Sequence, residues 1–159
     1  MKIAIIVSAV LLAAFAATLS VRPDLFRPAV VKKTDVYGFV PGMALDDVNK
    51  LITQRKYRCR QLPDAYVVDC NIDGTKVSIT VDGESDKHPV QRITAELGSG
   101  RDPSATVRAI SEQYGAQAVK AADGKWVWPV GSRFTLSYDG AAVTLSDERA
   151  GKASTAPNR

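Results

Sequence analysis

Two cysteines are the residues of this chain whose type and spacing most directly predict chemistry. Residues 57–62 and 66–70 have the composition of two short strands, and Asp64-Ala65 between them indicates a turn. The register around that turn places Cys59 directly opposite Cys70, with their Cβ atoms about 5 Å apart. We therefore predict a disulfide, which implies an oxidising compartment. Two reduced, buried thiols are the alternative.

The other residue types give no support for catalysis or for metal binding. The single histidine, His88, lies in a polar loop, and with two cysteines it does not complete a four-coordinate zinc site. No nucleophile elbow, phosphate-binding loop, dinucleotide fingerprint or Cys-x-x-Cys motif is present. The net charge of +4 is spread along the chain, which argues against nucleic-acid binding. We predict a protein that is not an enzyme and that uses no cofactor or metal.

A pair of tryptophans predicts a binding surface instead. Trp126 and Trp128 alternate along one strand and therefore point to one face. If the two hairpins of the chain have equivalent turns, that face also carries Arg58 and Arg60, with Asp69 opposite Arg60 as an exposed ion pair. Exposed Trp and Arg anchor protein interfaces, so we predict that these four residues bind a partner. The alternative is that the tryptophans belong to the core, where this residue type is usually mostly buried.

An internal repeat must position these residues. The stretch 74–83 recurs in character at 131–140, each copy with glycine at both ends and alternating apolar residues between. A helix is predicted before each copy, at 45–52 and at 103–114. The second has the clearer signals, with Asp102 as N-cap, Pro103 at the first turn and Gly115 as its stop.

A hairpin follows each predicted helix, and a fourth strand follows each repeated stretch. The strands are predicted at 57–62, 66–70, 74–83, 90–97, 117–122, 125–128, 131–140 and 142–146. The predicted fold class is α+β, with two tandem helix-plus-four-strand units that form one antiparallel sheet with the helices on one face. An N-terminal hydrophobic helix precedes them.

The ends of the chain predict an exported protein. Residues 1–21 contain an apolar run after Lys2 and predict a signal peptide or a membrane anchor. Residues 22–35 form a linker, 36–148 form the domain (units of about 40–97 and 102–147), and 149–159 form a disordered tail. The predicted location is the periplasm or cell envelope, either free or tethered to the inner membrane. The expected partners are an envelope protein and, through the N-terminal segment, the membrane.

A short motif adds a resemblance to known folds. Gly42-Met43 followed by Asp46-Asp47-Val48 resembles the Gly-Met-Ser/Thr-x-x-x-Val helix entry of β-lactamase inhibitory protein-like domains and of the small lipoprotein domain in outer-membrane β-barrel assembly. Ala44 stands where those domains have a capping Ser or Thr, and the lipid-bearing cysteine is absent. The resemblance covers 40–147 and implies a curved sheet backed by two helices, with an open face for another protein. A structural or small-ligand-binding periplasmic module is the alternative function.

Overall fold

Eight antiparallel strands form one sheet in the computed structural model, which describes residues 33–98 and 100–147. The sheet order is β1-β2-β3-β4-β8-β7-β6-β5, so β4 and β8 meet at its centre. The strands are β1 (Arg58–Leu62), β2 (Val67–Ile72), β3 (Thr75–Val81), β4 (Val90–Glu96), β5 (Val119–Lys120), β6 (Trp126–Val130), β7 (Phe134–Tyr138) and β8 (Ala142–Asp147). The predicted α+β class and antiparallel sheet are confirmed.

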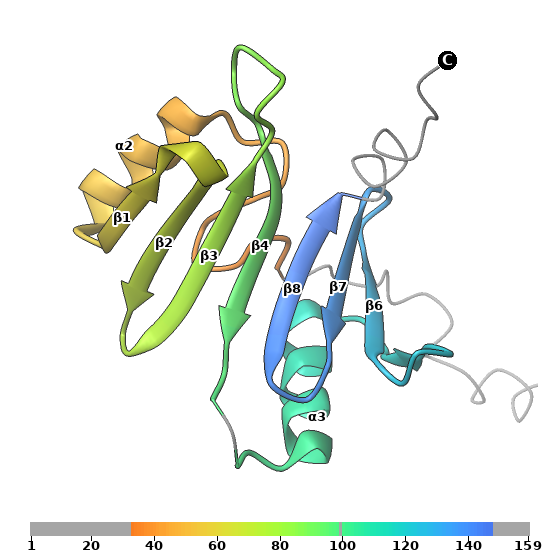
Figure 1. Cartoon of the computed structure of the whole chain (residues 1–159). Coiled ribbons are helices and arrows are strands. Elements are labelled where there is room, and N and C mark those ends of the chain that lie inside the picture. The colour runs from red at the N-terminus through yellow and green to blue at the C-terminus, as the bar shows by residue number, and fades with distance from the viewer. Residues whose placement is uncertain (1–32, 99, 148–159) are drawn as a thin grey trace, which may run out of the picture. The chain divides into compact units, whose positions relative to one another are not determined.

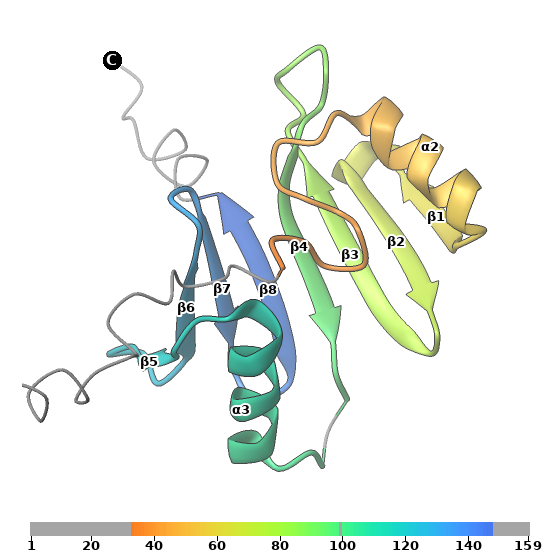
Figure 2. The same cartoon turned by 180° about the vertical axis from the view of Figure 1, so that it is seen from behind.

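Two helices, α2 (Leu45–Arg55) and α3 (Pro103–Tyr114), lie on the same face of this sheet (Figures 1 and 2). The predicted signals define α3 as expected. The Asp102 side chain accepts a hydrogen bond from the Ser104 amide at 2.9 Å, and Gly115 ends the helix with φ +70°. The N-cap of α2 is Ala44, whose side chain offers no such bond.

The core lies between the helices and the sheet. Strand residues alternate between the two faces, and the apolar ones on the helix-covered face are nearly all excluded from solvent. Val48 and Ile110 contribute the helical side of the same cluster. The strand residues of the core are Val68, Cys70, Ile72, Val77, Ile79, Val81, Val90, Ile93, Ala95, Trp128, Val130, Leu136, Tyr138, Val143 and Leu145.

The segment that leads into α2 fills the space between the two helices. It crosses the helix-covered face as the orange stretch in Figure 2, and Phe39 within it is fully buried. A tight turn holds it, in which the main-chain amides of Val36 and Phe39 each donate a hydrogen bond to the carbonyl oxygen of the other residue at 3.0 Å. The Tyr114 hydroxyl donates to the Asp35 carbonyl at 2.8 Å, and burial together with the Asp35 charge raises the pKa of Tyr114. This segment is therefore part of the core.

The predictions for the chain ends fall outside the described residues. These are the apolar anchor or signal at 1–21, most of the linker at 22–35 and the tail at 149–159. Neither of the two helices in the described ranges has the length and apolar character needed to span a bilayer.

Candidate partner-binding surface

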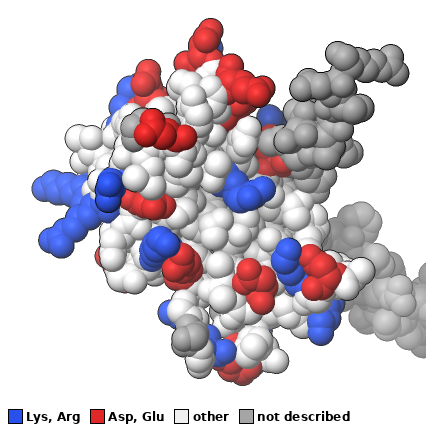
Figure 3. All heavy atoms as spheres, in the orientation of Figure 1, with Lys and Arg blue, Asp and Glu red and all other residues white. Residues whose placement is uncertain are grey.

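The face of the sheet opposite the helices is open and polar. Figure 3 shows this face, with lysine and arginine projecting at the side of β1 and α2 and charges of both signs scattered over the rest of it. Short hydroxyl side chains dominate its central strands. They are Ser78, Thr80, Thr94, Thr135, Ser137, Thr144 and Ser146. Such residues keep the central strands of an uncovered sheet face hydrated.

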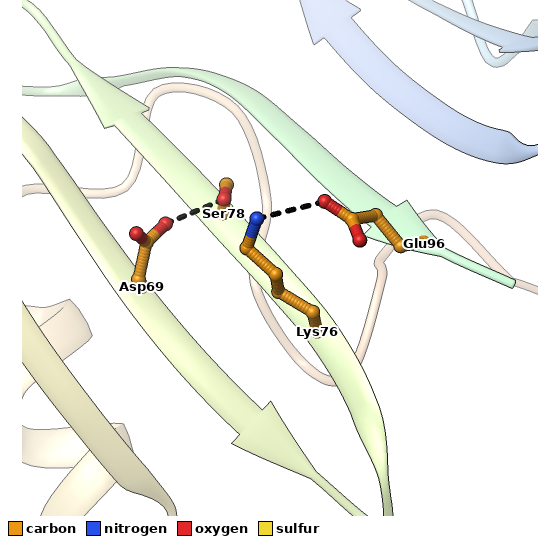
Figure 4. Close-up of polar contacts among 4 residues, drawn as sticks. All are labelled: Asp69, Lys76, Ser78 and Glu96. Atoms are coloured by element: carbon orange, nitrogen blue, oxygen red, sulfur yellow. Dashed lines mark hydrogen bonds and ion pairs between the residues drawn. The ribbon is translucent and has the colours of Figure 1, made fainter. Parts of the chain in front are cut away.

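The charged pairs that do cross this face are weak. Lys76 on β3 and Glu96 on β4 lie 2.9 Å apart, and the hydrogen bond and charge of Glu96 raise the pKa of Lys76 (Figure 4). Both side chains are more than half exposed, so the pair contributes little to stability.

The first hairpin has the predicted register and the predicted disulfide. Cys59 pairs with Cys70 across β1 and β2, and their sulfur atoms are bonded at 2.05 Å. Cys70 is buried beneath the helices, while Cys59 is half-buried. The cross-link therefore holds the outermost strand of the sheet against its neighbour.

The predicted ion pair between Arg60 and Asp69 is wrong, although the two residues do oppose each other. The Asp69 carboxylate turns toward β3 and accepts a hydrogen bond from the Ser78 hydroxyl (Figure 4). A serine hydroxyl on the other neighbouring strand thus competes for the same carboxylate. Among the described residues, Arg60 makes no ion pair.

Arg58 and Arg60 belong to a larger basic cluster, which we define as Arg55, Lys56, Arg58 and Arg60. All four are exposed, and none forms an ion pair with a described residue. Arg55 ends α2, Lys56 is its C-cap with φ +56°, and the two arginines lie on β1. A groove of about 340 Å³ lies among Arg55, Lys56, Arg58 and Asn71. Sequence reasoning missed Arg55 and Lys56, although a run of four cations within six residues was the available signal.

The tryptophans lie elsewhere, and their predicted placement on the open face is wrong. Trp128 is fully buried on the helix-covered face, and its indole N–H donates to the Ser111 hydroxyl of α3 at 2.9 Å. Trp126 lies on the same face and is half-buried beneath the Lys120 ammonium group, 5.6 Å from the ring centre. β6 is six strand positions from β1 in the sheet order, or roughly 29 Å at about 4.8 Å per step. The structure therefore does not bring Trp126 and Trp128 together with Arg58 and Arg60.

Loop length explains the error. β2 and β3 are joined by the two-residue turn Asp73-Gly74, whereas three residues, 131–133, separate β6 from β7. Five residues, 121–125, separate β5 from β6, whereas four, 63–66, separate β1 from β2. The Gly124 amide donates to the Ala121 carbonyl within this longer loop, and Gly124 has φ +84°. A shift of one residue moves every side chain of a strand to the other face. Trp128 therefore pairs with the buried Leu136, on the helix-covered side of the sheet where Val68 of β2 also lies.

The remaining candidates include a second polar groove of about 340 Å³, which lies on the open face among Arg92, Lys125 and Asp139. The His88 ring Nδ1 lies 2.7 Å from the Asp82 carbonyl oxygen, and within residues 33–98 and 100–147 no cluster of three His, Cys, Asp or Glu residues could hold a metal ion. A groove of about 190 Å³ lies on the helix side near Tyr37, Ile110 and Tyr114. It is smaller than the roughly 300 Å³ at which small-molecule sites usually begin.

These features define an α+β domain with an open polar sheet face, a disulfide-linked edge hairpin and one basic cluster. Comparison of the chain with protein-family models, with curated proteins and with solved structures finds no match.

Proposed function

We propose that this chain is a non-enzymatic cell-envelope protein that binds a protein partner through the open sheet face, next to β1. The observation that carries the proposal is the basic cluster. Its four exposed cations lack partners among the described residues, and two of them are fixed on a strand that a disulfide holds in place. Arginine is enriched in interfaces and is less strongly hydrated than lysine, which favours acidic protein surfaces as partners.

The envelope location is part of the same proposal. The disulfide favours an oxidising compartment, and the apolar run at the N-terminus favours export or anchoring. The small-ligand alternative has less support, because the apolar groove near Tyr114 has a volume of only about 190 Å³.

We also propose that the two helix-plus-four-strand units derive from one duplicated module, as in the β-lactamase inhibitory protein-like domains that the sequence resembles. The support is the equivalent order of elements, α2 with β1 to β4 and then α3 with β5 to β8. The repeated stretches at 74–83 and 131–140 contain the third strand of each unit.

Photocrosslinking tests the binding proposal. A photoreactive amino acid is placed at Thr80 or at Thr144 on the open face, and at Glu112 on the exposed side of α3 as the control. We expect one protein, identified by mass spectrometry, to be captured from both open-face positions and not from Glu112. Its capture should fall at least about fivefold in the Arg58→Glu/Arg60→Glu variant, whose folding is checked by circular dichroism. Equal capture from Glu112, or capture unchanged in the charge-reversal variant, would refute the proposal.

A further inference from the structure

The outer edge of β1 has main-chain groups that no described residue satisfies. β1 is the first strand in the sheet order, so β2 is its only neighbour among the described strands. The Cα atoms of Cys59 and Cys70 are 4.0 Å apart, which marks the close, non-hydrogen-bonded type of antiparallel pair. The N–H and C=O groups of Cys59 therefore point away from β2, as do those of Gln61 two residues along. No hydrogen bond from another described residue reaches these groups.

The opposite edge of the sheet is closed to pairing in a way that β1 is not. β5 has only two residues, and Pro129 removes a donor from the part of β6 that β5 leaves uncovered. β1 has five residues and no proline. Within the part of the chain that the structure describes, the protection of β1 against a further strand is charge, from Arg58 and Arg60.

Those charges select the strand that can bind. Antiparallel pairing of two copies of β1 centred on Cys59 would place the arginines of the two copies opposite one another, and like charges in that position are unfavourable. An incoming strand with Asp or Glu at alternating positions would instead pair with Arg58 and Arg60. Its main chain would bond to the outward groups of Cys59 and Gln61.

We infer that β1 is a docking edge that takes up an extended, alternately acidic segment of a protein partner as a ninth strand. This inference rests on the proposed function and states how the partner binds. The Cys59–Cys70 disulfide fixes β1 against β2 before binding, so that less conformational freedom is lost when the segment pairs.

The test uses the full chain in detergent micelles and a synthetic eight-residue peptide, with capped ends, in which Glu alternates with Thr. Binding is measured by fluorescence anisotropy, and amide hydrogen exchange is followed by NMR. We expect saturable binding, with exchange at the Cys59 and Gln61 amides slowed at least about tenfold at saturation. A peptide with Lys in place of Glu should not bind. A peptide with alternate N-methylated amides should bind at least about tenfold more weakly, because it keeps its side chains but loses the main-chain N–H groups that donate hydrogen bonds to β1.

Two variants test whether peptide binding depends on the charges of β1 or on charge elsewhere on the same face. Each opposed pair changes affinity by up to about fivefold, and charge reversal also replaces each attraction by a repulsion, so Arg58→Glu/Arg60→Glu should weaken peptide binding about tenfold or more. The matched control is Arg92→Glu, an exposed arginine on β4 in the middle of the same face, which should change binding less than about twofold.

The outcomes separate the two proposals. If N-methylation has no effect while charge reversal does, the partner docks by side chains alone, and the edge inference is wrong while the proposed function stands. If the peptide fails to bind but a crosslinked partner is found from Thr80 and Thr144, only the edge inference fails. If neither is seen, and vesicles of phosphatidylglycerol bind the basic cluster instead, both are wrong.

Discussion

Trp128 offers the sharpest test of the fold, because the structure places its side chain in the core. The indole is fully buried, and its N–H donates to the Ser111 hydroxyl, which itself donates to the Val107 carbonyl at 2.9 Å. The side chain therefore joins β6 to α3 through both apolar contact and a hydrogen bond. Replacement by phenylalanine removes the bond and part of the ring while keeping the site apolar.

The expected cost of Trp128→Phe is about 2 kcal/mol. The lost hydrogen bond accounts for about 1 kcal/mol, and the removed ring atoms with the space they leave for about another. For a chain of this length, that lowers the midpoint of thermal unfolding by about 4–8 °C. Trp128→Ala should cost about 3–5 kcal/mol. The control is Trp126→Phe, which should cost less than about 1 kcal/mol because that half-buried ring makes no hydrogen bond with a described residue.

Thermal and urea unfolding, followed by far-ultraviolet circular dichroism, measure these costs. Acrylamide quenching of fluorescence gives an independent readout, because Trp128 should be shielded and Trp126 partly accessible. The placement is refuted if Trp128→Phe unfolds at the wild-type temperature, or if both single-tryptophan variants are quenched equally. Either result would mean that α3 does not cover β6, and the open face would regain an aromatic anchor.

Three further outcomes follow from the described contacts. Ala44→Ser should stabilise the protein by about 0.5–1 kcal/mol in urea unfolding by adding the missing cap of α2, whereas Asp102→Ala should cost about 1 kcal/mol at α3. The pKa of Tyr114 is raised above its ordinary value of 10.0, so its contribution to stability is complete below about pH 10 and is lost as the pH rises further. Tyr114→Phe should flatten that alkaline decline in a series of unfolding midpoints. Reduction of the Cys59–Cys70 disulfide, which spans 11 residues, should cost at most about 3 kcal/mol, seen as a lower unfolding temperature with reductant.

Local signals explain how much of the fold could be predicted from the sequence. The limits of α3 follow from Asp102, Pro103 and Gly115, because caps and stops act through the main chain of their own helix. The Cys59–Cys70 register follows from a turn only a few residues away. Each of these features depends on residues that are close in sequence, which is why the sequence alone predicts them.

The features that could not be predicted depend on a third element. The face of Trp128 is set by the β5–β6 and β6–β7 loops, which are one residue longer than the β1–β2 and β2–β3 loops respectively, and that difference is not visible in the periodicity of the strand. Asp69 lies on β2, between Arg60 on β1 and Ser78 on β3, so both side chains are within its reach. Its carboxylate accepts a hydrogen bond from Ser78. The burial of Phe39 depends on the gap between two helices that are distant in sequence.

The positions of the aromatic residues decide where binding energy can come from. A sheet face built from serine and threonine offers few of the large anchors that dominate interfaces, because those anchors are mostly Trp, Tyr and Arg. Trp128 is committed to the core, and Trp126 lies on the helix-covered face. What distinguishes the β1 side of the open face is its pair of arginines, together with the outward main-chain groups of the same strand. Charge and main-chain hydrogen bonding therefore act together at β1, whereas the centre of the face offers Arg92 and side-chain hydroxyls but no free edge among the described strands.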